Sequence, residues 1–496
     1  MRSQSIVLGS VLAVILGCGG SSSNGSDGGN SDGAINPIID GALGAVDARP
    51  GQQGWDPADF DNVYNVGPGQ DYADPGEVPW ESLGPSTMVR IHWRAQPYAS
   101  KWVINTEATA ADPLVVVGVA DAGRLPVITG EDAVTRLELN YWNEERSVIK
   151  VGGSNLPNDT QVPSYVYIES LDIRGAHSSH SFTDETGASD TYNGNAASVH
   201  IEVGNHITVR GCVLTDSGNG LFSGSGSSDV VISGNHIHGN GNSGSIFEHN
   251  SYTESFGITF EYNRYGPLRA GAGGNNLKDR SAGTVIRYNW IESGNRQLDL
   301  VDSDYKSFTS DASYNTTYVY GNVLIEPDGA GNSQIVHYGG DSGDESRYRK
   351  GTLHFYANTV VSTRTGNTTL VRLSSSAESM DARNNVIVAT AGDGRLAITG
   401  GDGDATLTDN WLQQGWRNTH DTLNGTVTDQ GNIGGTAPGF VDLNGGDFTL
   451  AAGASCIGGA GSLAGGVAAP TREYVLHQQN AERADDGDPD IGAFER

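Results

Sequence analysis

Acidic and basic side chains recur in short runs through the middle of the chain, between residues 248 and 372. The runs are Glu248-His249, Lys278-Asp279-Arg280, Asp299 with Asp302, His337-Tyr338 and Arg372. Lys278 and Arg280 are two residues apart, so on a strand they share one face. If the runs lie on neighbouring parallel strands about 4.8 Å apart, their side chains come within contact range. We therefore expect one surface column that carries the chemistry of the protein.

The cations of this column suggest proton abstraction next to a carboxylate. A Lys held near an Arg has a lowered pKa and can act as a base. Arg280 can neutralise a substrate carboxylate by bidentate pairing. Together they would remove the acidic C5 proton of a uronic acid, and His337 or Tyr338 would protonate the leaving oxygen. The predicted catalytic residues are Lys278, Arg280, His249, His337 and Tyr338, and the predicted substrate-binding residues are Glu248, Arg296, Asp299 and Arg372.

The same residues allow other interpretations. Glu248, Asp299 and Asp302 could supply the acid and the base or nucleophile of a glycoside hydrolase. Asp299 and Asp302 could instead bind Ca²⁺, which takes oxygen ligands, and this cation would also ease the approach of an anionic glycan. The column could equally be the solvated surface of a non-catalytic, glycan-binding or adhesin-like protein.

A second recurring pattern indicates the elements that must position this column. Small or apolar residues lie five and three positions before a turn residue, and an apolar residue lies two positions after it, as in Val230, Ile232 and Ile237 around Asn235. The turn residues are Leu171, Cys212, Asn235, Asn263, Asn289, Asn322, Asn358, Asn385 and Asn410, separated by 23 to 41 residues. Alternation of this kind predicts strands buried on one face. An Asn at a bend tolerates the left-handed backbone conformation, and stacked Asn side chains can bond from coil to coil.

The pattern predicts an all-β chain, a single-stranded right-handed parallel β-helix with an Asn ladder. Each coil buries little alone, so many coils must stack. An antiparallel sandwich with Gly-rich turns is the alternative, but one turn residue recurring in one register argues against it. Further strands are expected at 88–93, 114–119, 125–128 and 147–151, before a regular ladder over about 165–412.

Composition narrows the possible partners. The chain has 496 residues, 70 of them Gly, and a net charge of −30 with a pI of about 4.5. This acidity disfavours nonspecific binding to nucleic acid. We expect a monomer that binds a polysaccharide, without nucleic acid.

The N-terminus has the features of a targeting segment. Arg2 precedes an apolar run over 6–16, and Cys18 follows as the expected lipidated residue of a bacterial lipoprotein. Gly19 after this Cys favours the outer membrane, with the protein facing the periplasm or the cell surface and the membrane contacted by the lipid anchor alone. An ordinary cleaved signal peptide is the alternative. The expected divisions are a signal peptide over 1–17, a tether and lead-in over 18–85, the β-helix over 86–455 and a C-terminal cap over 456–496.

One stretch of the charged column resembles a known family. The run Asn276-Leu277-Lys278-Asp279-Arg280-Ser281, followed by Arg287-Tyr288-Asn289, resembles the catalytic coil of β-helix polysaccharide lyases of the chondroitinase B and alginate lyase family. The resemblance implies that Lys278 is the base. The chain departs from that family on the next coil, where Leu298-Asp299-Leu300-Val301-Asp302 replaces the partnering Arg, so Arg280 or Arg296 would have to substitute.

Overall fold

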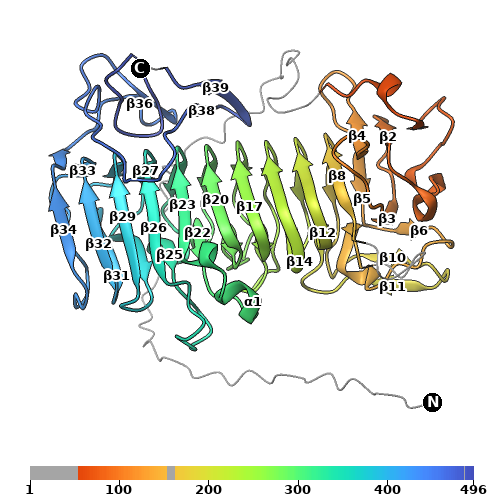
Figure 1. The fold of residues 1–496 in the computed structure, drawn as a ribbon, viewed down its shortest axis with the longest axis horizontal. Coiled ribbons are helices and arrows are strands. Elements are labelled where there is room, and N and C mark those ends of the chain that lie inside the picture. The colour runs from red at the N-terminus through yellow and green to blue at the C-terminus, as the bar shows by residue number, and fades with distance from the viewer. Residues whose placement is uncertain (1–53, 154–161, 485) are drawn as a thin grey trace, which may run out of the picture. The chain divides into compact units, whose positions relative to one another are not determined.

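The computed structural model describes residues 54–153, 162–484 and 486–496. The predicted signal peptide, Cys18 and most of the predicted tether lie outside these residues. Within the described part of the chain, no helix is long and apolar enough to cross a membrane. The described chain is nearly all β, with strands of successive coils side by side from β8 to β34 (Figure 1).

The strands pair in parallel on three faces of a β-helix, and β12 (Ala197–Arg210) and β14 (Asn219–Ser233) run through two of these faces. The first, called the groove face below, also contains β3 (Ser100–Ile104), β7 (Ser147–Val151), β16 (Ser251–Thr253), β19 (Leu277–Asp279), β22 (Leu298–Leu300), β25 (Gln334–Tyr338), β28 (Asn367–Leu373) and β31 (Arg395–Gly401). The second contains β1 (Asn62–Val66), β2 (Thr87–His92), β4 (Leu114–Val119), β8 (Ser164–Glu169), β17 (Ser255–Glu261), β20 (Ala282–Arg287), β23 (Thr316–Tyr320), β26 (Gly351–Tyr356), β29 (Glu378–Arg383), β32 (Asp404–Thr408) and β34 (Val427–Gln430).

The third face is an 11-stranded sheet of β5 (Val127–Thr129), β9 (Asp172–Arg174), β13 (Val213–Thr215), β15 (His236–Ile237), β18 (Arg264–Tyr265), β21 (Trp290–Glu292), β24 (Val323–Glu326), β27 (Thr359–Ser362), β30 (Val386–Ala389), β33 (Trp411–Gln413) and β35 (Ile433–Gly435). The remaining strands are β6 (Ala133–Thr135), β10 (Ser181–Thr183), β11 (Ser189–Thr191), β36 (Phe440–Asp442), β37 (Asp447–Leu450), β38 (Arg472–Val475) and β39 (Gln479–Glu482). The helices are α1 (Lys306–Thr309), η1 (Pro57–Asp59), η2 (Pro75–Glu77), η3 (Trp80–Ser82), η4 (Glu144–Arg146) and η5 (Ala312–Asn315).

The predicted parallel β-helix is confirmed, and its interior is built from the predicted apolar columns. Ile232 pairs with Phe260, which pairs with Ile286, and all three are fully buried. Ile237, after the turn, pairs with Tyr265 in the same way. The parallel coils begin at β1, before the expected boundary at 86, and the last coil strand is β35.

The turn asparagines form a buried hydrogen-bonded column between the second and third faces. Asn235 Nδ2 donates to Asn263 Oδ1 at 3.0 Å, and the same bond repeats through Asn289, Asn322, Asn358, Asn385 and Asn410 to Asn432, a member that the sequence pattern missed. The left-handed backbone expected of these asparagines belongs to the residue before each one, for example Tyr262 and Tyr288. The Asn is therefore needed for its side-chain amide and not for its backbone conformation.

The C-terminal segment after β35 folds back along the coils (Figure 1). β36 and β37 form an antiparallel hairpin, as do β38 and β39. Tyr288 Oη accepts a bond from Thr471 N at 3.0 Å, and Tyr356 Oη donates to Ala468 O at 2.9 Å. These bonds attach the segment to the residues beside the Asn column, on a different part of the helix from the groove face.

Replacing a central asparagine tests the stabilising role of this column. Asn322→Ala removes the acceptor of the Asn289 N and Nδ2 groups, which are buried. Because a buried polar group without a partner costs about 1–3 kcal/mol, the free energy of unfolding should fall by at least this amount. Denaturant unfolding measures the change. Asn424→Ala, at an exposed amide that bonds Asp402, should change stability little, and an equal effect of both variants would contradict a structural column.

Candidate active site

Strand register on the groove face brings four of the predicted residues into one column. Lys278 on β19 pairs with Asp299 on β22, Asp299 with His337 on β25, and His337 with Arg372 on β28. Tyr252 on β16 pairs with Lys278 and completes what we call the site column. Since alternate residues of a strand point to opposite faces, these five side chains share the outer face of the sheet.

Asp299 is the centre of the polar contacts. Its Oδ2 accepts bonds from Lys278 Nζ at 2.8 Å and from Asn275 Nδ2 at 2.7 Å, and its Oδ1 lies 2.8 Å from His337 Nδ1. The residue is only 2% exposed. Burial raises the pKa of this carboxyl, but Lys278, His337 and Arg296 together hold it well below its usual range. Asp299 is therefore an ionised, fully engaged anion.

Lys278 is a protonated cation between two carboxylates. Besides Asp299, its Nζ contacts Asp341 Oδ2 at 2.5 Å, and the side chain is 8% exposed. Burial lowers the pKa of Lys278, yet the two carboxylates outweigh burial and the net pKa is raised. Arg280 lowers the pKa of Lys278, as expected from the sequence. The net pKa is nevertheless raised, whereas a Lys that acts as a base needs a lowered pKa.

His337 has the geometry of a proton acceptor. Burial lowers the pKa of the imidazole, against the opposing effect of Asp299, so the ring is neutral at neutral pH. An ionised Asp299 can only accept, so Nδ1 carries the proton and Nε2 carries the lone pair. Nε2 lies 2.8 Å from Ser374 Oγ, in the residue that follows β28.

Arg280 reaches from β19 toward the same carboxylate as Lys278. Its Nη2 contacts the Asp341 oxygens at 3.0 and 3.3 Å, its Nε donates to Tyr252 Oη at 2.9 Å, and its Nη1 donates to Asp302 O. Lys278 and Arg280 thus hold one carboxylate jointly, whereas the sequence predicted that Arg280 would neutralise a carboxylate and that Lys278 would act as the base.

Tyr338 was predicted to face the substrate, and this prediction is wrong. Its neighbour His337 points outward, so Tyr338 points into the main apolar core, where it is fully buried. Its hydroxyl donates to Lys350 O at 3.3 Å, and burial raises its pKa to about 12. Asp279 also points inward, where it pairs with the buried Arg349 at 3.3 Å.

Glu248 and His249 lie outside the site column, because the strand of that coil begins later and places Tyr252 in register. His249 is 2% exposed, and its Nδ1 accepts a bond from Asn275 N at 2.8 Å. Burial, together with Lys278, lowers its pKa to about 3. His249 therefore fixes the turn that carries Asn275, and does not exchange protons near neutrality.

The two predicted substrate-binding arginines take different positions: Arg296 lies beside the site column and Arg372 lies in it. Arg296 Nη1 lies 3.8 Å from Asp299 Oδ1 and its Nη2 donates to Gln334 Oε1 at 2.9 Å. Arg372 occupies the column itself with an exposed side chain. Both are placed to meet an anionic ligand at this end of the column.

A Ca²⁺ site at Asp299 and Asp302 does not fit the side chains present. The Lys278 ammonium already contacts Asp299, and fully buried Asp302 uses Oδ1 to accept the amides of Asp341 and Ser342 at 2.8 and 3.4 Å. Across residues 54–153, 162–484 and 486–496, no group of three or more His, Cys, Asp or Glu side chains is placed to hold a metal ion.

Three contributors were missed at the sequence level. Asp341 and Ser374 come from turns after the groove-face strands, and Asn275 from a turn before one, where no periodic pattern marks them. Tyr252, three residues after the predicted run Glu248-His249, is a fourth, and counting back from Lys278 by one coil could have found it.

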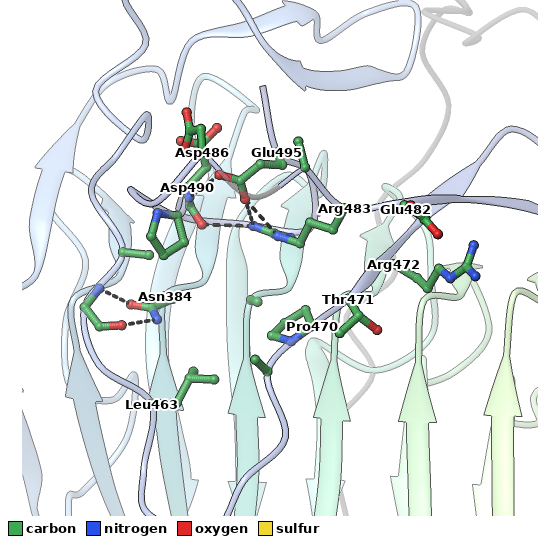
Figure 2. Close-up of a pocket in the computed structure, with 16 residues that line it drawn as sticks. Asn384, Leu463, Pro470, Thr471, Arg472, Glu482, Arg483, Asp486, Asp490 and Glu495 are labelled. Carbon is green, nitrogen blue, oxygen red and sulfur yellow. Dashed lines mark hydrogen bonds and ion pairs between the residues drawn. The ribbon is translucent and has the colours of Figure 1, made fainter.

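A cavity of about 560 Å³ lies elsewhere, under the C-terminal segment (Figure 2). Figure 2 shows Arg483 directed toward Glu495 and Asp490. Its Nε donates to Glu495 Oε2 at 2.8 Å, and its Nη2 donates to Asp490 O at 3.1 Å. Among its described lining residues none belongs to the site column. We assign this cavity to the packing of the segment and the chemistry to the site column.

The buried contacts of Lys278 make it a structural residue as well as a candidate for chemistry. Lys278→Met leaves the Asp299 charge buried without its main partner, so unfolding free energy should fall by about 3–5 kcal/mol. Lys278→Met combined with Asp299→Asn should recover part of this loss. Thermal and urea unfolding measure the stability of the single and the double variant. Lys306→Met, at an exposed lysine, is the control, and a Lys278→Met variant as stable as this control would contradict the buried pair.

Comparison with known proteins gives structural similarities only. No protein-family model and no curated protein matches the chain. Among solved structures, pectate lyase Pel9A is 13% identical, with a TM-score of 0.46 over 88% of this chain and 97% of its own. An alginate lyase from Paenibacillus sp. strain FPU-7 is 11% identical, with a TM-score of 0.43 over 74% of this chain and 99% of its own. With identities of 13% and 11% and TM-scores below 0.5, these two likenesses support no conclusion about the activity of this chain.

Proposed function

We propose that this protein is a polysaccharide lyase that cleaves a uronic-acid-containing glycan by β-elimination. The observation that carries the proposal is the site column, where buried Asp299 lies between His337, whose neutral ring it orients, and Lys278, which shares the Asp341 carboxylate with Arg280. The chain has a net charge of −30, so the gathering of Lys278, Arg280, Arg296 and Arg372 at one place is a local exception. Such cations favour an anionic substrate.

The residues divide the reaction between them. Lys278 and Arg280 hold the uronate carboxylate and offset its charge, which makes the adjacent C5 proton more acidic. His337 Nε2 takes this proton, the C5–H electron pair forms the C4–C5 double bond, and the C4–O bond breaks. The imidazolium, stabilised by Asp299, then returns the proton to the leaving oxygen. The products are a new reducing end and an unsaturated sugar.

A glycoside hydrolase is less well supported, because it needs a carboxylic acid that can give a proton. Asp299 is ionised and its two oxygens are occupied by Lys278, Asn275 and His337. Asp302 is fully buried. A binding protein without activity would have no need for a neutral His aligned by a buried carboxylate.

A product screen tests the proposal. Alginate, pectate, glycosaminoglycans and neutral glycans are incubated with the purified protein, and the ultraviolet absorbance of unsaturated sugars is recorded together with reducing ends. Both signals should rise together on a uronate polymer. His337→Gln should lose about 10²–10⁴-fold in rate. His354→Gln is a matched control, since His354 faces Asp381 at 3.8 Å on the second face. Reducing ends without absorbance would indicate hydrolysis.

The pH dependence separates His337 from Lys278 as the base. Because the pKa of His337 is lowered from the ordinary value, the active neutral form persists through neutrality and is lost only as pH falls. The acidic limb of kcat/KM should therefore lie below about pH 6.5. A Lys base whose pKa is raised would instead give a rate that rises toward high alkaline pH, and such a profile would exclude His337 as the base.

A further inference from the structure

We propose that Lys278 and Arg280 form a carboxylate-binding site which the chain's own Asp341 fills in the free protein, and that a uronate carboxylate binds there by displacing Asp341. The choice of a uronate as the ligand rests on the proposed function. The site itself rests only on the contacts of these three residues.

The Asp341 carboxylate occupies the position that the carboxylate of an anionic ligand would take. Its two oxygens lie 2.5 Å from Lys278 Nζ and 3.0 Å from Arg280 Nη2. The Asp341 side chain is 34% exposed, whereas those of Lys278 and Arg280 are 8% and 14% exposed. The carboxylate therefore covers the two cations from the solvent side, which is also the side from which a substrate arrives.

The charges around the site leave room for an exchange of anions. Lys278, Arg280 and Arg296 are three cations that contact the buried carboxylates of Asp299 and Asp302, and Arg372 is a fourth cation with an exposed side chain. Apart from the exposed Arg372, one positive charge remains, and Asp341 balances it. A substrate carboxylate would balance it equally well, so the displacement leaves no buried cation without an anion.

The segment that carries Asp341 is held firmly at its ends and lightly at its tip. Gly339 N donates to Leu300 O at 3.1 Å, and Arg349 N donates to Gly339 O at 2.8 Å. The Arg349 side chain is fully buried against Asp279. Residues 341–346 are exposed, and the backbone amides of Asp341 and Ser342 both donate to Asp302 Oδ1, at 2.8 and 3.4 Å. The tip can move while the base of the loop stays in place.

Displacement has a thermodynamic consequence. While Asp341 occupies the site, only the open fraction of the protein binds a ligand, so the apparent affinity is lowered by that fraction. Asp341→Ala removes the competitor and leaves both cations in place. Carboxylate ligands should therefore bind this variant more tightly than the wild-type protein, by about 5-fold or more.

Binding of small carboxylates tests the inference without turnover. Acetate and glucuronate are titrated into the full chain, with chloride and glucose as matched controls at equal ionic strength, and ligand NMR and melting temperature are recorded. Both anions should bind Asp341→Ala at least about 5-fold more tightly than wild type. Asp344→Ala is the loop control, because Asp344 contacts Ser346 and Arg347 and not the site. Asp341→Asn, which keeps the side-chain volume, should behave as Asp341→Ala does.

The outcomes separate this inference from the proposed function. Equal affinities of wild type and Asp341→Ala, or no binding to either, would overturn the displaced-anion site even if the protein is a lyase. Tighter binding by Asp341→Ala in a protein that releases no unsaturated product would keep the site and reject the lyase. Adding Lys278→Arg, which moves the charge, should reduce the gain seen with Asp341→Ala, and an unchanged gain would place the bound anion elsewhere.

Discussion

An ionised carboxylate loses several kcal/mol of hydration when it is buried, unless protein groups replace the water. Asp299 is buried in this way, and Lys278, Asn275 and His337 replace its water. Each partner is fixed by the same charge. The ammonium stays protonated, the Asn275 turn is held against the sheet, and the imidazole keeps one tautomer. The candidate site therefore depends on this one side chain.

Asp299 can have these partners only because of the strand register. Parallel pairing places Asp299 directly between Lys278 and His337. If the register of β22 shifted by one residue, the Asp299 side chain would point into the core. Two features fix that register: the apolar columns inside the coils, and the hydrogen-bonded asparagines between the second and third faces. Loops between the strands can then vary in length without disturbing it, and one such loop brings Asp341 onto Lys278 from 63 residues away.

The sequence predicted the coils and part of the site for the same physical reason. A repeated turn residue with buried residues at fixed offsets constrains the backbone, so Lys278, Asp299, His337 and Arg372 could be aligned coil by coil. Tyr338 was assigned to the wrong face because the alignment was uncertain by one residue. Glu248 and His249 were misplaced because the distance from the turn to the next strand differs on that coil. The raised pKa of Lys278 depends on Asp299 and also on Asp341, and Asp341 lies in a loop without any periodic signal.

In the proposed complex, a uronate chain binds along the site column and presents its carboxylate to Lys278 and Arg280. A crystal structure of the His337→Gln variant with an oligosaccharide of the cleaved polymer shows whether it does. We expect a sugar carboxylate between Lys278 and Arg280, Asp341 displaced, and the C5 carbon facing the position of His337 Nε2. An oligosaccharide bound elsewhere, for example in the cavity under the C-terminal segment, with Asp341 still on Lys278, would contradict it.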